Sequence, residues 1–284
     1  MSGIQDLEFN RRDFLRFGSV GAAALCLGST LSLSGNEKAD PYRGFKMGIQ
    51  SYSLREFKVE KALEASKALG LLFWEAYPGH IPETAVPGTV AEQKKLLSTA
   101  GVKLLAYGVL GFDKDETKAR QHFDYAKAMG IETLSANPNK DKGTFDLLDK
   151  LVEEYGINIA IHNHGPNALY DKIDDVVAMV KDRHPRVGAC VDTGHYLRSK
   201  ESPVEAIERL KGRVYGVHLK DVKNAEVFKI VGEGDLDVLG CLKALKAQDY
   251  KHCLALEYEE NAKNPVSDLE ACLKHVRAAF EKLG

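Results

Sequence analysis

The chain has 284 residues, of which 44% are hydrophobic and 28% are charged, as in an ordinary globular protein. A formal net charge of −2 lacks the basic excess with which proteins bind nucleic acid or anionic membranes, so we expect no nucleic-acid partner. The length suits one large domain, such as an α/β barrel of about 250 residues.

The N-terminal segment has the layout of an export signal. The charged stretch RRDFLR at residues 11–16 precedes a short Gly- and Ala-rich apolar run at residues 17–28. The arginine pair resembles the bacterial twin-arginine signal, which implies the twin-arginine export machinery as a partner and a periplasmic or otherwise exported protein. We expect a signal at residues 1–34, a lead-in at 35–45 and one domain at 46–284. The apolar run is shorter than the roughly 20 residues of a membrane-spanning helix, so no stable membrane span is expected after cleavage.

From residue 46 onward, short β-rich runs alternate with segments of helical period. The predicted strands cover residues 46–51, 71–77, 103–109, 133–137, 157–164, 187–192, 214–220 and 253–258. The predicted helices cover residues 59–69, 91–100, 117–129, 145–155, 173–182, 203–210, 239–247 and 266–283. Eight strand–helix units in strict alternation predict a single (β/α)8 TIM barrel. An open doubly wound sheet is less favoured, because QSYS at 50–53 follows the first strand where that fold has a glycine-rich phosphate turn.

Polar side chains gather at the carboxyl ends of the predicted strands, where TIM barrels carry their active sites. In chain order they are Glu75, Asn137, His162, His164, Asp192, His195, His218, Lys220, Glu257 and Glu259. Several lie two residues apart and therefore share one face of a strand. The residues between them, such as Ile161, Leu219 and Leu256, are apolar. We expect the polar set to converge on one pocket, and the alternative is a series of unrelated strand exits to solvent.

Four members of this set form a candidate metal site. They are His162, Asp192, His218 and Glu257, and their imidazole and carboxylate groups suit Mn²⁺, Co²⁺ or Zn²⁺. Such an ion could polarise a sugar carbonyl and acidify the neighbouring C–H bond. Glu257 or Glu75 would move the proton, Lys220 would stabilise the enolate oxygen, and His195 would act on the substrate hydroxyl. The expected substrate-binding residues are His164, His195, Lys220 and Asn137.

Four short stretches occur in order along the chain. They are VDTGHY at 191–196, VHLKD at 217–221, VGEGDLD at 231–237 and LEYE at 256–259. Together they resemble the sugar phosphate isomerase/epimerase family, the xylose isomerase-like TIM barrels, over residues 46–283. The resemblance implies a divalent metal on His162, Asp192, His218 and Glu257. It also implies that His195 contacts the substrate, and that Lys220 and the loop at 232–234 are features of the substrate side.

The sequence departs from the ketose 3-epimerases of this family at one position. Those enzymes carry a glutamate where His162 stands, and they use it together with the glutamate of the last strand as two opposed acid/base groups. Two enzyme classes therefore remain open. One is a metal-dependent isomerase or epimerase that acts on a non-phosphorylated sugar through an enediolate. The other is a metal-dependent lyase that cleaves 3-keto-glycosides by β-elimination.

The same residues disfavour two further classes of protein. A non-catalytic sugar-binding barrel would keep the site without a base, but Glu257 is present. A zinc nuclease similar to endonuclease IV is disfavoured by the net charge of −2 and by the export signal. A sugar phosphate is not expected as substrate, because phosphosugars are cytoplasmic and the signal directs the chain outward. Barrels of this kind commonly pair, so a homodimer is a possible assembly.

Overall fold

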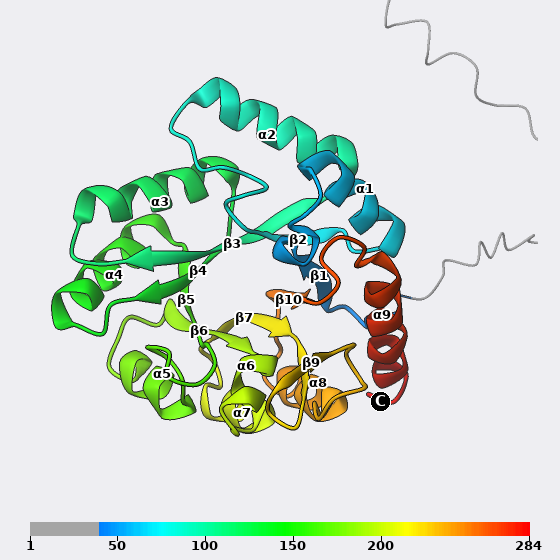
Figure 1. Ribbon diagram of the computed structural model, residues 1–284. Helices are drawn as coiled ribbons and strands as arrows, with labels where there is room; N and C mark the ends of the chain where they lie inside the picture. The colour runs from blue at the N-terminus through cyan, green and yellow to red at the C-terminus, as the bar shows by residue number, and fades with distance from the viewer. Residues whose placement is uncertain (1–39) are drawn as a thin grey trace, which may run out of the picture. The chain divides into compact units, whose positions relative to one another are not determined.

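The computed structural model describes residues 40–284, and the predicted export signal lies outside these residues. Eight parallel strands close into a barrel in the order β1-β10-β7-β6-β5-β4-β3-β2. Helices surround this ring on the outside (Figure 1). The barrel strands are β1 (Lys46–Gln50), β2 (Phe73–Ala76), β3 (Lys103–Phe112), β4 (Thr133–Pro138), β5 (Asn158–His162), β6 (Val187–Asp192), β7 (Val214–Leu219) and β10 (Cys253–Leu256). The predicted TIM barrel is therefore confirmed.

Each predicted helix is present, with bounds within a few residues of those expected. The helices are α1 (Val59–Leu69), α2 (Pro87–Ala100), α3 (Glu116–Met129), α4 (Lys142–Tyr155), α5 (Ile173–Val180), α7 (Pro203–Arg209), α8 (Val238–Lys246) and α9 (Val266–Glu281). The sequence analysis missed three short elements beyond the strand ends. They are the 3-10 helix η2 (Ser51–Leu54), helix α6 (Thr193–Arg198) and an antiparallel hairpin of β8 (Asp221–Lys223) and β9 (Val227–Lys229).

Glycines end the first four long helices and turn the chain back toward the barrel. Gly70, Gly101, Gly130 and Gly156 cap α1, α2, α3 and α4 in the left-handed conformation, with φ between 69° and 78°. A residue with a Cβ rarely adopts this conformation, and the cap N–H groups bond back to carbonyls of the last helical turn. Gly212 also has a positive φ, but it lies in the turn before β7, because α7 already ends at Arg209, with Leu210 as its cap.

The strands sort their side chains with a period of two. Outward-facing residues such as Ile161, Leu219 and Leu256 are fully buried in the layer between strands and helices. Inside the barrel, Leu105, Cys253 and Ala255 form a small apolar cluster with Phe73. It lies toward the amino-terminal end of the strands, because Phe73 and Cys253 are the first residues of β2 and β10. The polar residues of the inward face are therefore left for the carboxyl end.

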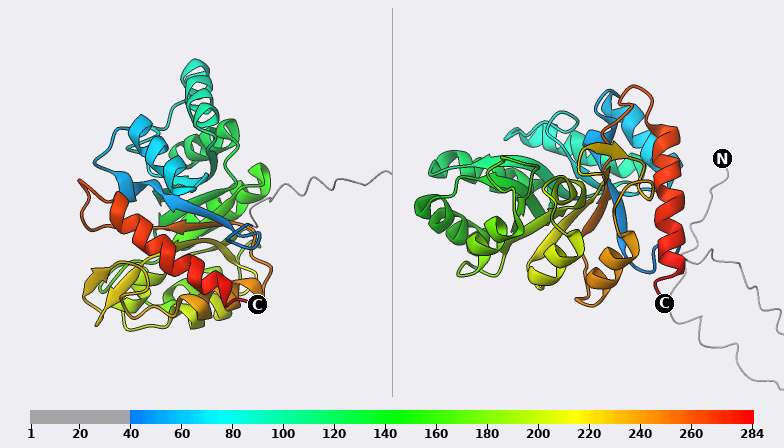
Figure 2. Two further views of the ribbon diagram at one scale, coloured as in Figure 1. Left: turned by 90° about the vertical axis from the view of Figure 1, so that its right-hand side faces the viewer. Right: turned by 60° about the horizontal axis from the view of Figure 1, so that its bottom comes forward.

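The last helix completes the outer layer. Helix α9 contacts both α1 and α8, so the end of the domain packs beside its beginning, and Figure 2 shows α9 running along the side of the barrel. No helix within residues 40–284 is both long enough and apolar enough to cross a membrane.

Candidate active site

Four buried side chains meet at the carboxyl ends of β5, β6, β7 and β10. One donor atom from each of His162, Asp192, His218 and Glu257 lies within 4.8 Å of the other three. His162 Nε2 is 2.9 Å from His218 Nδ1 and 3.5 Å from Asp192 Oδ2, and Glu257 Oε2 is 3.0 Å from His218 Nδ1. The structure therefore brings together the four metal ligands that the sequence predicted, and we call them the metal cluster.

The chemistry of the metal cluster fits a divalent cation. Asp192 Oδ2 and Glu257 Oε2 are buried and accept no well-directed hydrogen bond. Their burial is offset only by the Lys220 ammonium and the facing imidazoles, at 3.0 Å or more, which leaves room for a cation to satisfy them. His162 Nε2 and His218 Nδ1 can form a hydrogen bond with each other only if one of them is protonated. A metal ion would instead accept the lone pairs of both nitrogens. Two imidazoles and two carboxylates are a donor set suited to Zn²⁺, Co²⁺ or Mn²⁺.

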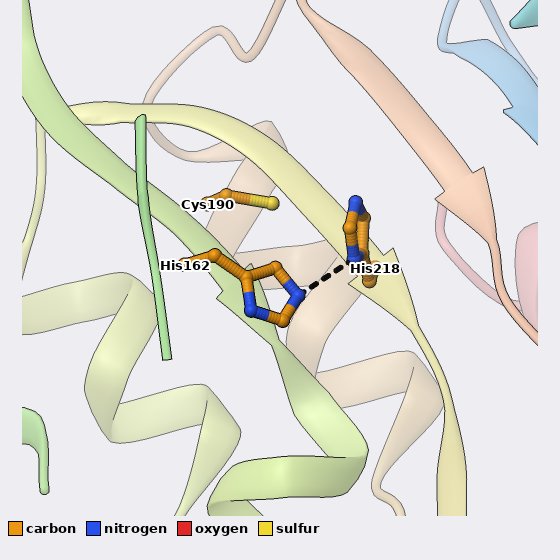
Figure 3. Close-up of side chains that lie close together, drawn as sticks. All are labelled: His162, Cys190 and His218. Atoms are coloured by element: carbon orange, nitrogen blue, oxygen red, sulfur yellow. Dashed lines mark hydrogen bonds between the residues drawn. The ribbon is translucent and has the colours of Figure 1, made fainter. Parts of the chain in front are cut away.

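A buried thiol lies close to the metal cluster. Cys190 precedes Asp192 by two residues, so both side chains point into the barrel. Cys190, His162 and His218 form a second group of donor atoms within 4.8 Å of one another, and Figure 3 shows His162 directed at His218 with the thiol beside them. The thiol fits because residue 216 is a glycine: a Cβ at Gly216 would lie only 3.0 Å from the Cys190 sulfur. Burial raises the pKa of Cys190, so the thiol is neutral at neutral pH. The sequence analysis did not single out Cys190, although the period of two from Asp192 points to it.

Glu75 lies inside the barrel, behind His218. It is fully buried, does not line the cavity, and places Oε2 2.9 Å from His218 Nε2. Burial alone would lower the pKa of His218, but the neighbouring carboxylates of Glu75 and Glu257 help to raise it well above its ordinary value. A carboxylate at this nitrogen leaves Nδ1 free to bind a metal, as is common for metal-binding histidines. The structure thus places Glu75 outside the cavity lining and in contact with His218, where it can orient that imidazole.

Lys220 bridges the carboxylates of the site. Its Nζ lies 3.0 Å from Asp192 Oδ2, 3.0 Å from Glu257 Oε2 and 2.5 Å from Glu259 Oε1. Burial would lower the pKa of Lys220, but these carboxylates outweigh it and raise the pKa, so the ammonium stays charged. Burial would likewise raise the pKa of Glu257, and Lys220 and His218 lower it instead. Glu257 is therefore ionised at neutral pH.

The side chain that follows one strand forms hydrogen bonds with the backbone at the carboxyl end of the neighbouring strand. Asn163 donates to the carbonyl of Asp192 at 3.0 Å and accepts from its N–H at 2.8 Å. Thr193 donates to the Lys220 carbonyl at 2.6 Å and accepts from its N–H at 2.9 Å. Asp192 Oδ1 accepts from the N–H of His195 at 2.7 Å and so caps α6. These bonds fix the backbone on which the metal cluster stands.

A cavity of about 470 Å³ opens above the metal cluster. Six buried residues line it, and of these we call the floor the four with ionisable side chains, His162, His195, Lys220 and Glu257; the other two are Gln50 and Gly108. Eight lining residues are half-buried or exposed, and of these we call five the rim, namely Tyr52, Tyr77, Pro78, Arg198 and Phe228. The remaining three are Val109, His164 and Glu259. Asp192 and His218 lie below the floor and are fully buried.

Two neutral histidines line the cavity. Burial lowers the pKa of His164 to about 4 and that of His195 to about 3. Arg198 Nη1 lies 3.1 Å from His195 Nδ1. Because arginine only donates, Nδ1 accepts and the ring proton of His195 is on Nε2. His195 can therefore offer an N–H to a substrate oxygen, in line with its predicted role.

Asn137 is the one predicted substrate-binding residue that the structure leaves apart from the others. It follows Thr133 and Ser135 on the inward register of β4, but its side chain is exposed and does not line the cavity. Among the residues that sequence reasoning missed are Arg198 and Phe228, which come from α6 and the β8–β9 hairpin. Neither follows a barrel strand directly, so the strand-end rule does not reach them.

Comparisons with known proteins agree with this architecture. Residues 63–278 match the family described as "Xylose isomerase-like TIM barrel". The chain is 23% identical over 284 residues to an inosose dehydratase of Clostridium perfringens, with 91% of this chain and 90% of the relative covered. A crystal structure of the IOLI protein with a bound zinc atom superimposes with a TM-score of 0.68 at 16% identity, covering 84% of this chain and 99% of that one. An L-ribulose 3-epimerase gives 0.66 at 15% identity, covering 84% and 95%.

Proposed function

The chain belongs to the xylose isomerase-like TIM barrel family, and from this premise we propose that it is a metal-dependent carbohydrate enzyme that eliminates a leaving group next to a sugar carbonyl. One observation carries the proposal. The ionisable carboxylates of the cavity, Glu257 and Glu259, both follow β10, whereas β5 and α6 contribute the imidazoles of His162, His164 and His195. Because both carboxylates lie on one side of the cavity, the site offers carboxylate acid/base groups to one face of the substrate only, which suits removal of one proton α to a carbonyl.

The residues of the site divide the work as follows. A divalent ion on the metal cluster would act as a Lewis acid on the substrate carbonyl. Glu257, ionised at neutral pH, accepts the α-proton. The Lys220 ammonium and the Nε2–H of His195 stabilise the negative charge that develops on the oxygen. The bond to the leaving oxygen on the β-carbon then breaks, a C=C bond forms, and Glu257 returns its proton to that oxygen.

Two further points support elimination. Epimerisation returns the proton from the opposite face and needs a second acid/base group there, but His162 occupies the position that the 3-epimerases fill with glutamate. The relative that spans nine-tenths of this chain is named as a dehydratase, and removal of water beside a carbonyl is an elimination. The likeness to the 3-epimerase structure supports the fold alone.

Isomerisation of a non-phosphorylated sugar is the second candidate, and the same geometry favours it. A proton held on Glu257 can return to the neighbouring carbon instead of to a leaving oxygen. The two candidates therefore share every step up to the enediolate and differ only in where this proton goes.

Proton NMR in deuterated water tests the proposal directly. The protein is reloaded with Mn²⁺, Co²⁺ or Zn²⁺ and offered free ketoses, an inosose and 3-keto-glycosides, with Asp192→Ala as the control. We expect release of water or of the aglycone, together with an unsaturated ketone. Deuterium on carbon with an isomer as product would establish the isomerase instead. Sugar binding without exchange, with every metal, would leave a non-catalytic barrel.

We also propose that residues 1–34 direct export of the chain by the twin-arginine route. The support is the RRDFLR stretch at 11–16 and the short apolar run after it. Cell fractionation of a strain expressing the full chain should find the shortened protein outside the cytoplasm. The double variant Arg11→Lys, Arg12→Lys should keep the full-length precursor inside, and normal export of this variant would contradict the proposal.

A further inference from the structure

We propose that the rim of the cavity is a second subsite, which binds a ring attached to the reacting sugar. The inference rests on the proposed function and narrows its substrate class to glycosides whose leaving group carries a ring, either aromatic or a second sugar. Its basis is the division of the cavity into a polar floor and a largely aromatic rim. The floor holds the reacting carbons, and the rim holds the leaving group.

The rim places aromatic side chains on two sides of the cavity. Tyr52 and Tyr77 follow β1 and β2, whereas Phe228 stands on the β8–β9 hairpin. The Phe228 ring reaches over α6, where its centroid lies 6.1 Å from that of His195. Helix α6 follows β6, which lies four strands from β2 in a barrel of eight. The two aromatic walls therefore face each other across the mouth, with the floor between and below them.

Both walls are held in place by charged neighbours. The Tyr52 and Tyr77 rings meet edge to face at 5.4 Å, and the Arg55 guanidinium lies 4.6 Å from the centre of the Tyr52 ring. Arg55 is tied down in turn by its 2.5 Å hydrogen bond to the Glu259 carbonyl. On the other wall, Arg198 lies 5.4 Å from the Phe228 ring. Aromatic rings anchored in this way offer flat contact area with little entropy left to lose.

The exposure of the rim indicates a ligand that extends to the mouth. Tyr52 is 37% exposed, although it lines the same cavity as the buried polar floor. The floor residues could bind the carbonyl and hydroxyl groups of a free sugar, but such a ligand would leave the aromatic rings of the rim exposed to water. A cavity of about 470 Å³ lies in the range of ~300–1,000 Å³ that holds drug-sized ligands. The faces of a second ring would cover the aromatic surface.

Glycosides without a keto group test the subsite apart from the reaction. They have no carbonyl and therefore no acidic α-proton, so the proposed elimination cannot proceed and binding is measured at equilibrium. Isothermal titration of the metal-loaded protein would compare methyl β-glucoside, phenyl β-glucoside and methyl β-cellobioside, all of which are blocked at the anomeric carbon. We expect phenyl β-glucoside, methyl β-cellobioside or both to bind about fivefold more tightly than methyl β-glucoside, the gain that a stacking contact of about 1 kcal/mol gives. The better of the two probes identifies the leaving group as aromatic or sugar.

Variants assign this gain to the rim. Tyr52→Ala and Phe228→Ala should each remove most of it and leave methyl β-glucoside unchanged, and Phe228→Leu should retain part of it. Val227→Ala is the matched control, because Val227 is on the same hairpin, is 53% exposed and does not line the cavity. Equal affinity for all three probes, or a gain that survives both alanine variants, would overturn the subsite. A confirmed gain in a protein that exchanges no deuterium would instead refute the proposed function and leave the subsite standing.

Discussion

Strands β5, β6, β7 and β10 each lead into a buried residue of the metal cluster, whereas β2, β3 and β4 end in Ala76, Phe112 and Pro138. We call β5, β6, β7 and β10 the first half of the barrel and β2, β3 and β4 the second half. In the first half, the Asn163 and Thr193 side chains join neighbouring strands. The second half contributes Tyr77, Pro78, Gly108 and Val109 to the cavity. A polar residue at a strand end is therefore a metal-cluster residue only in the first half, where neighbouring strands supply partner residues at the same level of the barrel, whereas Glu75 of β2 acts through His218.

The largest expected effect comes from the first half. Asp192→Ala removes a ligand oxygen of the metal cluster and the cap of α6, so divalent-metal affinity should fall by more than about 100-fold, since even outer partners of a metal site cost 10–100-fold. Turnover should fall to background. Competition with a chromophoric zinc chelator measures the affinity, and circular dichroism checks the fold. If the variant bound metal as tightly as the parent protein, the conclusion that the first half of the barrel holds the metal would be wrong.

Glu75→Gln tests whether a residue of the second half affects metal binding indirectly, because Glu75 belongs to β2 and acts only through His218. We expect a loss of roughly 10–100-fold in metal affinity with the fold retained. Glu83→Gln is the matched control, since Glu83 also pairs with a histidine, His122, at 2.8 Å but outside the cavity. The same chelator assay serves both variants. An equal loss in both would mean that Glu75 stabilises the barrel rather than orienting His218.

Lys220→Met should change binding and turnover in opposite directions. The ammonium lies 3.0 Å from two oxygens that would bind the metal, so its removal should raise metal affinity by about tenfold. Turnover should fall, because the charge that stabilises the enolate oxygen is lost. Chelator competition and the NMR assay give the two numbers separately. Weaker metal binding in this variant would mean that Lys220 holds the carboxylates in place more than it repels the ion.

Asn137→Ala should have the smallest effect. The side chain is exposed and lies outside the cavity lining, so we expect substrate affinity and turnover within about twofold of the parent protein, as for most exposed substitutions. Steady-state kinetics on the substrate identified by NMR provides the test. A tenfold rise in KM would show that the β4 end closes over the bound substrate.

The sequence predicts the metal cluster because its residues follow from two local rules, the period of two along a strand and the position of sites at carboxyl ends. Both rules refer to residues close together in the chain. The rules also nominate Glu75, but its true place follows from the barrel interior, where an inward residue of β2 meets β7. That contact depends on closure of the whole ring, which no local pattern encodes.

The β8–β9 hairpin shows the other limit. Its turn residues Asn224 and Ala225 both have positive φ, but the pair lacks the glycine that makes such turns recognisable. The path of the following loop depends on the buried Asp221 carboxylate, which accepts N–H bonds from Val222, Gly232, Gly234 and Leu236. Phe228 reaches the rim through this arrangement, so its role could not be inferred from its place in the sequence.

The contact between Glu75 and His218 joins the second strand of the barrel to a strand more than half the domain later. The orientation of His218 that this contact provides therefore exists only once the ring has closed, and a partly folded chain would offer an ion a less ordered set of ligands. Metal loading would then follow folding. A chain that crosses the membrane already folded would then carry the metal available where it folded, and the cell compartment, more than the donor atoms, would choose the ion.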